Sequence, residues 1–283
     1  MKNLLAENRT IFLDGSMGAV LLKNGVESTK IKDVCIHSPE LVERIHKDYV
    51  DAGCDIILTS TFNVSPTEKD ETNRAILDAG LSVARNAVAE TNCKVALGFG
   101  PTGKIYYPYS KETIEVAYDF YAPLIRDFSH RADLIIFETM ADITELKGAI
   151  KACEDFSTVP VFISMTFTKK ERTWIGARLK EYIDVINSAS NVIAVGLNCT
   201  LTPKEMVPLL QKLKEAISLP IFAEPNMGSP YVDENGQTAY KMTSDEFVED
   251  MMELHNIGIN ILGGCCGSDA ECIRKLKEKI ENL

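Results

Sequence analysis

Three cysteines have the spacing to do chemistry together, namely Cys199, Cys265 and Cys266. Cys199 ends the run Gly-Leu-Asn-Cys, and the other two are neighbours in Gly-Gly-Cys-Cys-Gly. The flanking glycines allow a backbone turn tight enough to aim both neighbouring sulfurs at one point. Three protein ligands with a fourth position left open are typical of a catalytic zinc ion, whereas a structural zinc site normally has four. We therefore expect one zinc ion on these cysteines.

The charge of such a centre favours one kind of chemistry. Three thiolates on a divalent ion leave one net negative charge, which makes the ion a weaker Lewis acid toward water than a zinc held by histidines. Hydrolysis is therefore disfavoured. The same centre can bind an incoming thiol, displace its proton at neutral pH and keep the sulfur electron-rich for attack on an alkyl group.

Two other interpretations of the cysteines stay open. Cys265 and Cys266 could form a strained vicinal disulfide, or all three cysteines could be ordinary buried residues. Cys272 lies close by in the sequence, but it falls within a helical pattern. We expect Cys272 in the core rather than as a fourth metal ligand.

The composition argues against several classes of function. The chain has 283 residues, 25% of them charged, and a formal net charge of −11, which argues against nucleic acid and anionic membranes as partners. No apolar run approaches the roughly 18 residues of a membrane span, and residues 1–10 lack the apolar stretch of a secretory signal. We expect a cytoplasmic protein with reduced cysteines, so that clustered ones are metal ligands or catalytic groups.

Short β-branched runs alternate with amphipathic helical patterns along the whole chain. Each run is almost entirely apolar, as parallel strands buried on both faces are. The eight runs are residues 10–13, 55–59, 95–98, 134–137, 161–164, 192–196, 221–223 and 259–262. Helices are expected at 38–52, 74–91, 111–130, 143–156, 203–217 and 244–258, with a further one near the end. This alternation without a linker predicts a single-domain α/β fold, a (β/α)8 barrel over residues 1–283.

A doubly wound open sheet is the alternative fold. The glycine fingerprint for dinucleotides is absent after the first strand, where Asp14-Gly15-Ser16-Met17-Gly18 stands instead, and this weakens the alternative. In a barrel, the two cysteine motifs end the sixth and the eighth strands. Both would then lie at the carboxyl face, where the catalytic groups of this architecture are found.

These motifs resemble those of the zinc-dependent homocysteine S-methyltransferases, which place zinc ligands in Gly-x-Asn-Cys and Gly-Gly-Cys-Cys-Gly. The resemblance extends over nearly the whole chain. It includes Leu-Asp-Gly-Ser-Met-Gly at 13–18, Thr-Ser-Thr-Phe-Asn at 59–63, Gly-Pro-Thr-Gly at 100–103, Phe-Glu-Thr-Met at 137–140 and Glu-Pro-Asn at 224–226. The runs at 100–103 and 138–143 are most similar to the homocysteine module of cobalamin-dependent methionine synthase, and the betaine and S-methylmethionine enzymes look more distant.

The resemblance implies contacts to the amino-acid part of homocysteine. Asp14 and Glu138 match the acidic positions that contact the amino acid, and we expect them to bind its ammonium. The backbone around Gly15, Ser16 and Gly18 would receive its carboxylate. The structural alternatives are that Asp14 only starts a turn and that Glu138 caps a helix.

Two asparagines are weaker candidates for substrate contacts. Asn63 and Asn226 could each contact substrate or hydrogen-bond loop backbone. Asn226 follows the seventh strand, between the two cysteine-bearing strands, and could approach the open zinc position.

The implied activity is methyl transfer to the thiolate of homocysteine, which gives methionine. The chain ends at Leu283 without the folate, corrinoid and reactivation modules of complete cobalamin-dependent enzymes, so we expect methylcobalamin on a separate corrinoid protein or methyl-donor module. S-methylmethionine, betaine and S-adenosylmethionine are alternative donors. A zinc- or thiol-sensing barrel without turnover is the alternative from another class.

Some residues that could carry chemistry have a simpler explanation. The four histidines fall in or beside helical segments and are expected at the surface or in packing: His37, His46, His130 and His255. The aromatic loop at 106–109 and Trp174 could cover the site, but we expect them to pack on the barrel. The segment 168–186 looks short for the family, which would favour a bulky protein-bound donor or another thiol acceptor.

Overall fold

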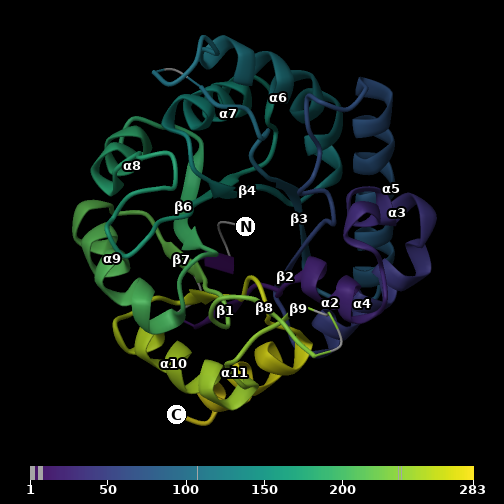
Figure 1. Ribbon diagram of the computed structural model, residues 1–283, viewed down its shortest axis with the longest axis vertical. Coiled ribbons are helices and arrows are strands. Elements are labelled where there is room, and N and C mark those ends of the chain that lie inside the picture. Colours follow the sequence, from purple (N-terminus) through teal and green to yellow (C-terminus); the bar gives the residue numbers. More distant parts are fainter. Residues whose placement is uncertain (1–3, 6–8, 107, 235, 237) are drawn as a thin grey trace.

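The computed structural model describes residues 4–5, 9–106, 108–234, 236 and 238–283 (Figure 1). Eight parallel strands form a ring in which neighbours follow the chain order. They are β1 (Ile11–Phe12), β2 (Ile56–Leu58), β3 (Lys94–Phe99), β4 (Leu134–Met140), β5 (Val161–Met165), β6 (Val192–Asn198), β7 (Ile221–Glu224) and β10 (Ile261–Leu262). β1 pairs with β10, and a bridge between Leu13 and Ile56 joins it to β2. The ring is therefore closed, which confirms the (β/α)8 barrel and excludes the doubly wound sheet.

Helices surround the ring on its outer side (Figure 1). They are α2 (Met17–Lys23), α3 (Val34–His37), α4 (Pro39–Asp51), α5 (Asp70–Val88), α6 (Ile114–Phe128), α7 (Ile143–Phe156), α8 (Leu179–Ile186), α9 (Pro203–Ala216), α10 (Ser244–Asn256) and α11 (Ala270–Glu281). Two 3-10 helices, η1 (Ser28–Asp33) and η2 (Ser129–Arg131), and a hairpin of β8 (Tyr231–Val232) and β9 (Thr238–Ala239) complete the described elements. No helix of the described segments is long and apolar enough to cross a bilayer.

Side-chain caps fix where several helices begin. Asp142 accepts the amide of Thr144 at 2.7 Å and starts α7 at the predicted residue. In α10, Thr243 and Glu246 form a capping box, so this helix also begins as predicted. The predicted start of α5 at residue 74 was too late. This helix begins at Asp70, because two acidic residues in its first turn favour the helix amino terminus.

The apolar side chains form two separate cores, one inside the ring and one between the ring and the helices. This arrangement explains why the strands lack a polar face. The inner core consists of Ile11, Leu13, Ile56, Leu58, Ala96, Leu134, Ile136, Phe162, Ala194, Phe222 and Ile261. Because these residues fill the barrel, the space for a ligand lies above them, at the carboxyl ends of the strands.

The aromatic loops differ partly from expectation. Tyr106 is buried, as predicted, and Tyr107 lies outside the described residues. Trp174 is 70% exposed and Tyr109 is 64% exposed, so the prediction that they pack on the barrel is wrong. The turn that carries Trp174 is closed by its own backbone, with Thr173 donating to the carbonyl of Ala177 at 2.9 Å. A loop that satisfies its own polar groups does not need to fold its tip onto the barrel.

We predict that His46 makes the protein sensitive to acid. His46 is fully buried in α4, and neither ring nitrogen has a hydrogen-bond partner among the described residues. Burial lowers its pKa from 6.5 to about 4. Between these two values the unfolded chain binds a proton that the folded chain does not, so the free energy of unfolding falls as the pH falls. The total loss, complete only below about pH 4, is about 3 kcal/mol, of which about 2 kcal/mol is expected between pH 7 and pH 5.

Urea unfolding at pH 7 and pH 5 measures this effect. The His46→Leu variant should lose this part of the pH dependence, while the part due to other groups stays. Equal loss of stability between the two pH values in both proteins would contradict the prediction.

Candidate metal and substrate site

The three predicted cysteines meet at the carboxyl face of the barrel. The sulfurs of Cys199 and Cys266 are 3.8 Å apart, and those of Cys265 and Cys266 are 4.0 Å apart. All three sulfurs lie within 4.8 Å of one another, and no disulfide joins them. Sulfurs bound at ~2.3 Å to one tetrahedral ion would be about 3.8 Å apart. The cluster therefore fits a zinc ion. Cys272 is buried in the core, as expected.

Hydrogen bonds among the three sulfurs shift the pKa values of the three thiols in different directions. Contacts from Cys265 and Cys266 lower the pKa of Cys199 to about 3. The same contacts, together with burial, raise the pKa of Cys265 well above its usual range and that of Cys266 to about 11. One thiolate that accepts from two thiols is thus favoured by the sulfurs alone. A bound divalent cation would favour three thiolates instead.

The backbone that presents Cys199 is strained. Cys199 and Thr200 have φ values of +61° and +62°, a region that side chains other than glycine rarely adopt. Two contacts hold the turn, namely the Cys199 amide, which donates to the carbonyl of Glu224 at 2.9 Å, and the hydroxyls of Thr166 and Thr200, which are 2.5 Å apart. Because of these two left-handed residues, the chain leaves the direction of β6 directly after Asn198, and the sulfur of Cys199 lies in the cluster.

Asn198 is a residue that the sequence analysis did not single out, and it connects three strands. Its Oδ1 accepts from the amide of Thr139 at 2.7 Å and from the hydroxyl of Ser164 at 2.8 Å, and its Nδ2 donates to the hydroxyl of Thr139 at 2.8 Å. Thr139 itself has a φ of +56°. Asn198 therefore fixes the strained backbone beside Glu138.

Asn226 orders the cysteine loops. Its Oδ1 accepts from the amide of Cys266 at 3.0 Å, its own amide donates to the carbonyl of Leu201 at 2.8 Å, and its side chain lowers the pKa of Cys199 through a hydrogen bond. Asn226 thus makes the contact with loop backbone that the sequence analysis considered. Tyr240, which was not predicted from the sequence, hydrogen-bonds the thiol of Cys266 and partly offsets the rise of its pKa that the contact with Cys199 causes.

A pocket of about 340 Å³ opens beside the cysteine cluster. Eight of the nine predicted site residues line it, and Asn226 is the exception. The lining residues are Asp14, Gly15, Ser16, Met17, Gly18, Ile31, Leu58, Thr59, Ser60, Phe62, Asn63, Glu138, Thr139, Cys199, Glu224, Gly264, Cys265 and Cys266. No lysine, arginine or histidine is among these described residues. The pocket is therefore suited to a ligand with a positive charge.

Three carboxyl groups face this pocket from different strands, two of them buried, Asp14 and Glu224, and one partly buried, Glu138. Asp14 accepts from the amide of Leu58 at 2.9 Å, so it also links the ends of β1 and β2. Glu138 lies within β4 and caps no helix, since Asp142 caps α7. Glu224 ends β7 and is 3% exposed. Glu224 was not predicted, although an acidic residue at the end of an apolar run is a signal that the sequence carries at this position.

Burial makes the negative charge in this pocket costly. It raises the pKa of Glu138 to about 8, with a smaller contribution from the charge of Cys199. Burial likewise raises the pKa of Asp14 and of Glu224 well above the usual range, and each of these two is raised further by Glu138. A cation bound between these groups would favour their charged forms.

The residues predicted to receive the substrate carboxylate, and Asn63, lie in different surroundings. Ser16 caps α2 by accepting the amide of Ala19 at 3.1 Å, and its own amide donates to Ser268. Gly15 is held closely, because a Cβ added to it would lie 2.9 Å from the hydroxyl of Tyr49. Asn63 lines the pocket with an exposed side chain.

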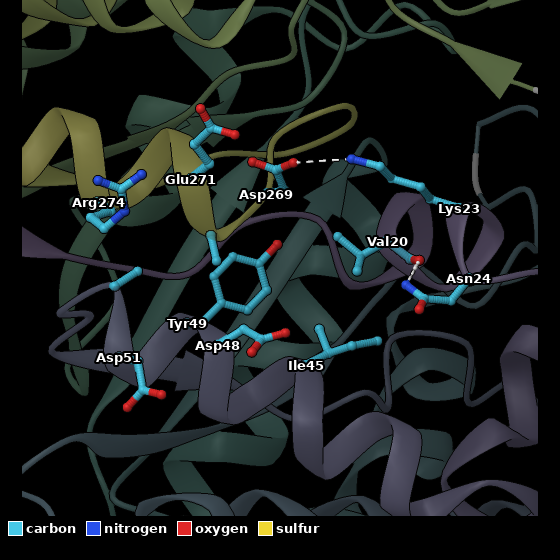
Figure 2. Close-up of a pocket in the computed structure, with 12 residues that line it drawn as sticks. Val20, Lys23, Asn24, Ile45, Asp48, Tyr49, Asp51, Asp269, Glu271 and Arg274 are labelled. Atoms are coloured by element: carbon cyan, nitrogen blue, oxygen red, sulfur yellow. Dashed lines mark hydrogen bonds and ion pairs between the residues drawn. The ribbon is translucent and has the colours of Figure 1, made fainter.

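A larger cavity of about 630 Å³ lies outside the barrel mouth, between α2, α4 and α11 (Figure 2). Its lining contains no cysteine and mixes both charges, with Lys23 3.6 Å from Asp269. This cavity shares no lining residue with the pocket beside the sulfurs, so a ligand in it would not contact the cysteine cluster.

Comparisons with known proteins agree with this geometry. A model of the family described as homocysteine S-methyltransferase matches residues 11–280. The methionine synthase of Mycobacterium tuberculosis is 26% identical over 261 residues, which are 87% of this chain and 22% of that protein. The chain thus spans about a fifth of the length of this curated relative.

Solved structures of the homocysteine methyltransferase MmuM from Escherichia coli have the same fold. Its metallated form superposes with a TM-score of 0.81 at 22% identity, covering 98% of this chain and 99% of that chain. Its oxidized form gives a TM-score of 0.83 at 22% identity, covering 98% of both chains.

We predict that the cysteine cluster holds the metal. The purified protein should contain about one zinc per chain by elemental analysis, and Cys199→Ser should lose most of it, because a serine hydroxyl is a poor replacement for a thiolate ligand. Cys272→Ala is the matched control and should keep its zinc. Equal zinc content in Cys199→Ser and the unmodified protein would contradict the assignment.

We also predict that Asn198 stabilises the site. Asn198→Ala removes four hydrogen bonds, one of them a long contact from Nδ2 to the sulfur of Cys265, and leaves the Thr139 amide without its acceptor, so the free energy of unfolding should fall by about 2–3 kcal/mol. Urea denaturation measures this loss. Asn191→Ala is the control, because the buried side-chain N and O of Asn191 have no partner among the described residues, and it should change stability far less. Equal losses would show that Asn198 has no special structural role.

Proposed function

The chain belongs to the homocysteine S-methyltransferase family, and on that premise we propose that it is an enzyme that methylates the thiol of homocysteine to form methionine. The observation that supports this most is that three thiols and three carboxyl groups line one pocket. Homocysteine carries a sulfur for the first group and an ammonium for the second. We propose that residues 1–283 form its homocysteine-binding barrel domain.

We propose that Cys199, Cys265 and Cys266 hold one zinc ion. When bound, zinc supplies a Lewis acid that stabilises the substrate sulfur as a thiolate at neutral pH. The chain contributes sulfurs that already have suitable spacing, since they lie within 4.8 Å of one another. Two hydrogen bonds keep the two cysteine loops together, one from the Cys266 amide to Oδ1 of Asn226 and one from the Cys199 amide to the carbonyl of Glu224.

The amino-acid end of homocysteine orients its sulfur. We propose that Asp14 and Glu138 accept hydrogen bonds from the ammonium, and that the backbone from Gly15 to Gly18 receives the carboxylate. Because these groups and the cysteines line the same pocket, the sulfur would point at the cluster while the amino-acid end stays fixed. Asn63 and Asn226 are the weaker proposed contacts, the first from the exposed rim and the second from outside the lining.

The transfer itself forms one bond and breaks another. The homocysteine sulfur donates an electron pair to the methyl carbon, and the bond between that carbon and its donor breaks. Fixed orientation and exclusion of water from the pocket supply much of the acceleration, because the reactants then meet as if in one molecule.

We propose that the methyl group comes from a methyl-corrinoid carried by a separate protein. Two features support this donor, namely the resemblance of residues 100–103 and 138–143 to the homocysteine module of methionine synthase and the match to the Mycobacterium tuberculosis methionine synthase.

A panel of donors tests the proposal. With homocysteine as acceptor, methylcobalamin or a methyl-corrinoid protein should give methionine at least about 10-fold faster than S-methylmethionine, betaine or S-adenosylmethionine, a difference of about 1.4 kcal/mol in the barrier. Cys265→Ser is the negative control for each donor. Full turnover with S-methylmethionine alone would overturn the corrinoid donor. Tight homocysteine binding without product from any donor would favour a sensing protein instead.

A further inference from the structure

Glu224 is a buried acid in the pocket without an assigned role. Its side chain is 3% exposed, and its Oε2 has no hydrogen-bond partner among the described residues. A buried carboxylate oxygen without a donor costs free energy, so its retention calls for a ligand or a structural reason. Glu224 also passes close to Gly263, where an added Cβ would come within 3.2 Å of its Cγ. The glycine leaves room for the acid.

The position of Glu224 relates it to both cysteine loops. β7 pairs with β6 on one side and with β10 on the other. Glu224 is the partner of Asn198 in the register, and its carbonyl accepts the amide of Cys199 at 2.9 Å. Glu224 therefore lies at the end of β7, between β6 and β10, the two strands that precede the cysteines.

The three acids of the pocket together match the donors of an ammonium group. A primary ammonium has three N–H donors. Asp14 accepts from the amide of Leu58 through Oδ2 and lines the pocket, and Oε2 of Glu224 has no hydrogen-bond partner among the described residues. Glu138 lines the same pocket from β4. The three acids thus line one pocket.

We propose that Glu224 is a substrate-binding residue that accepts the third hydrogen bond of the homocysteine ammonium, beside Asp14 and Glu138. This inference rests on the proposed function, since it names a further contact of the same substrate. The consequence is selectivity: the site requires a thiol that carries a primary ammonium and discriminates against thiols that lack it.

The other roles open to a buried acid fit Glu224 less well. Among the described residues, the group that could hold a metal ion consists of the three cysteines and does not include Glu224. A purely structural acid would have no buried oxygen without a partner. Oε1 of Glu145 accepts from the Thr102 amide at 2.6 Å and from the Tyr121 hydroxyl at 2.9 Å, and neither oxygen of Glu145 is among the buried atoms without a partner. Glu224 differs from Glu145 in this respect, although both are buried.

Binding of two thiols to the cobalt-substituted protein tests the inference. Cobalt in place of zinc gives an absorption spectrum that reports thiol coordination without turnover. The two thiols are homocysteine and 4-sulfanylbutanoate, which lacks the amino group but keeps the sulfur and carboxylate. Glu224→Gln should weaken homocysteine binding by about 10- to 100-fold, the range expected for one charge-assisted hydrogen bond. It should not weaken binding of the deaminated thiol.

Two further variants complete the experiment. Glu224→Asp keeps the charge and should restore part of the homocysteine affinity. Glu145→Gln removes a buried acid outside the pocket and should leave both affinities unchanged. Equal weakening of both thiols by Glu224→Gln, or no weakening of homocysteine, would overturn the inference. If the unmodified protein shows no spectral change with homocysteine, the proposed function itself fails, and the inference fails with it.

Discussion

The pairing of β7 with both β6 and β10 is the contact on which the site depends. It sets the ends of three neighbouring strands side by side, so that residues 67 positions apart in the sequence, Cys199 and Cys266, bring their sulfurs to 3.8 Å. The register also sets Glu224 opposite Asn198. A shift of one residue in either pairing would turn each of these side chains to the other face of the ring.

Strain at the mouth of the barrel is concentrated where the site needs it. Outside glycine, left-handed backbone occurs at Thr139, Glu171, Cys199 and Thr200 among the described residues, and three of these four flank the pocket or its cysteines. Asn198 and the pair of threonine hydroxyls hold these turns in place. Such conformations cost free energy and persist only where surrounding contacts hold them. They are typical of sites whose groups must be in position before the ligand binds.

The sequence predicted the ring and the cysteine cluster because both depend on local patterns. Buried parallel strands appear as apolar runs, and the barrel then requires their ends to converge. Asn198 was missed because its role lies in contacts to Thr139 and Ser164, 59 and 34 residues away, which no local pattern reveals. Glu224 was missed for a simpler reason, since only Asn226 of its motif was considered. Trp174 was misjudged because hydrophobicity alone does not tell a packed aromatic residue from an exposed one.

The number of paired residues between neighbouring strands varies around the ring. β1 and β10 are two residues long, and β1 meets β2 through the single bridge of Leu13 and Ile56, whereas β5 and β6 pair at five positions. Local opening costs least free energy where the ladder is shortest. Asp14 and Cys265 both follow this seam, so part of the ligand site stands on the segment that opens most easily. A ligand that joins Cys265 to Cys199 across β7 would tie the β10 side of this weak segment to the long strand β6 by mass action, and amide hydrogen exchange in β10 would slow as the ligand binds.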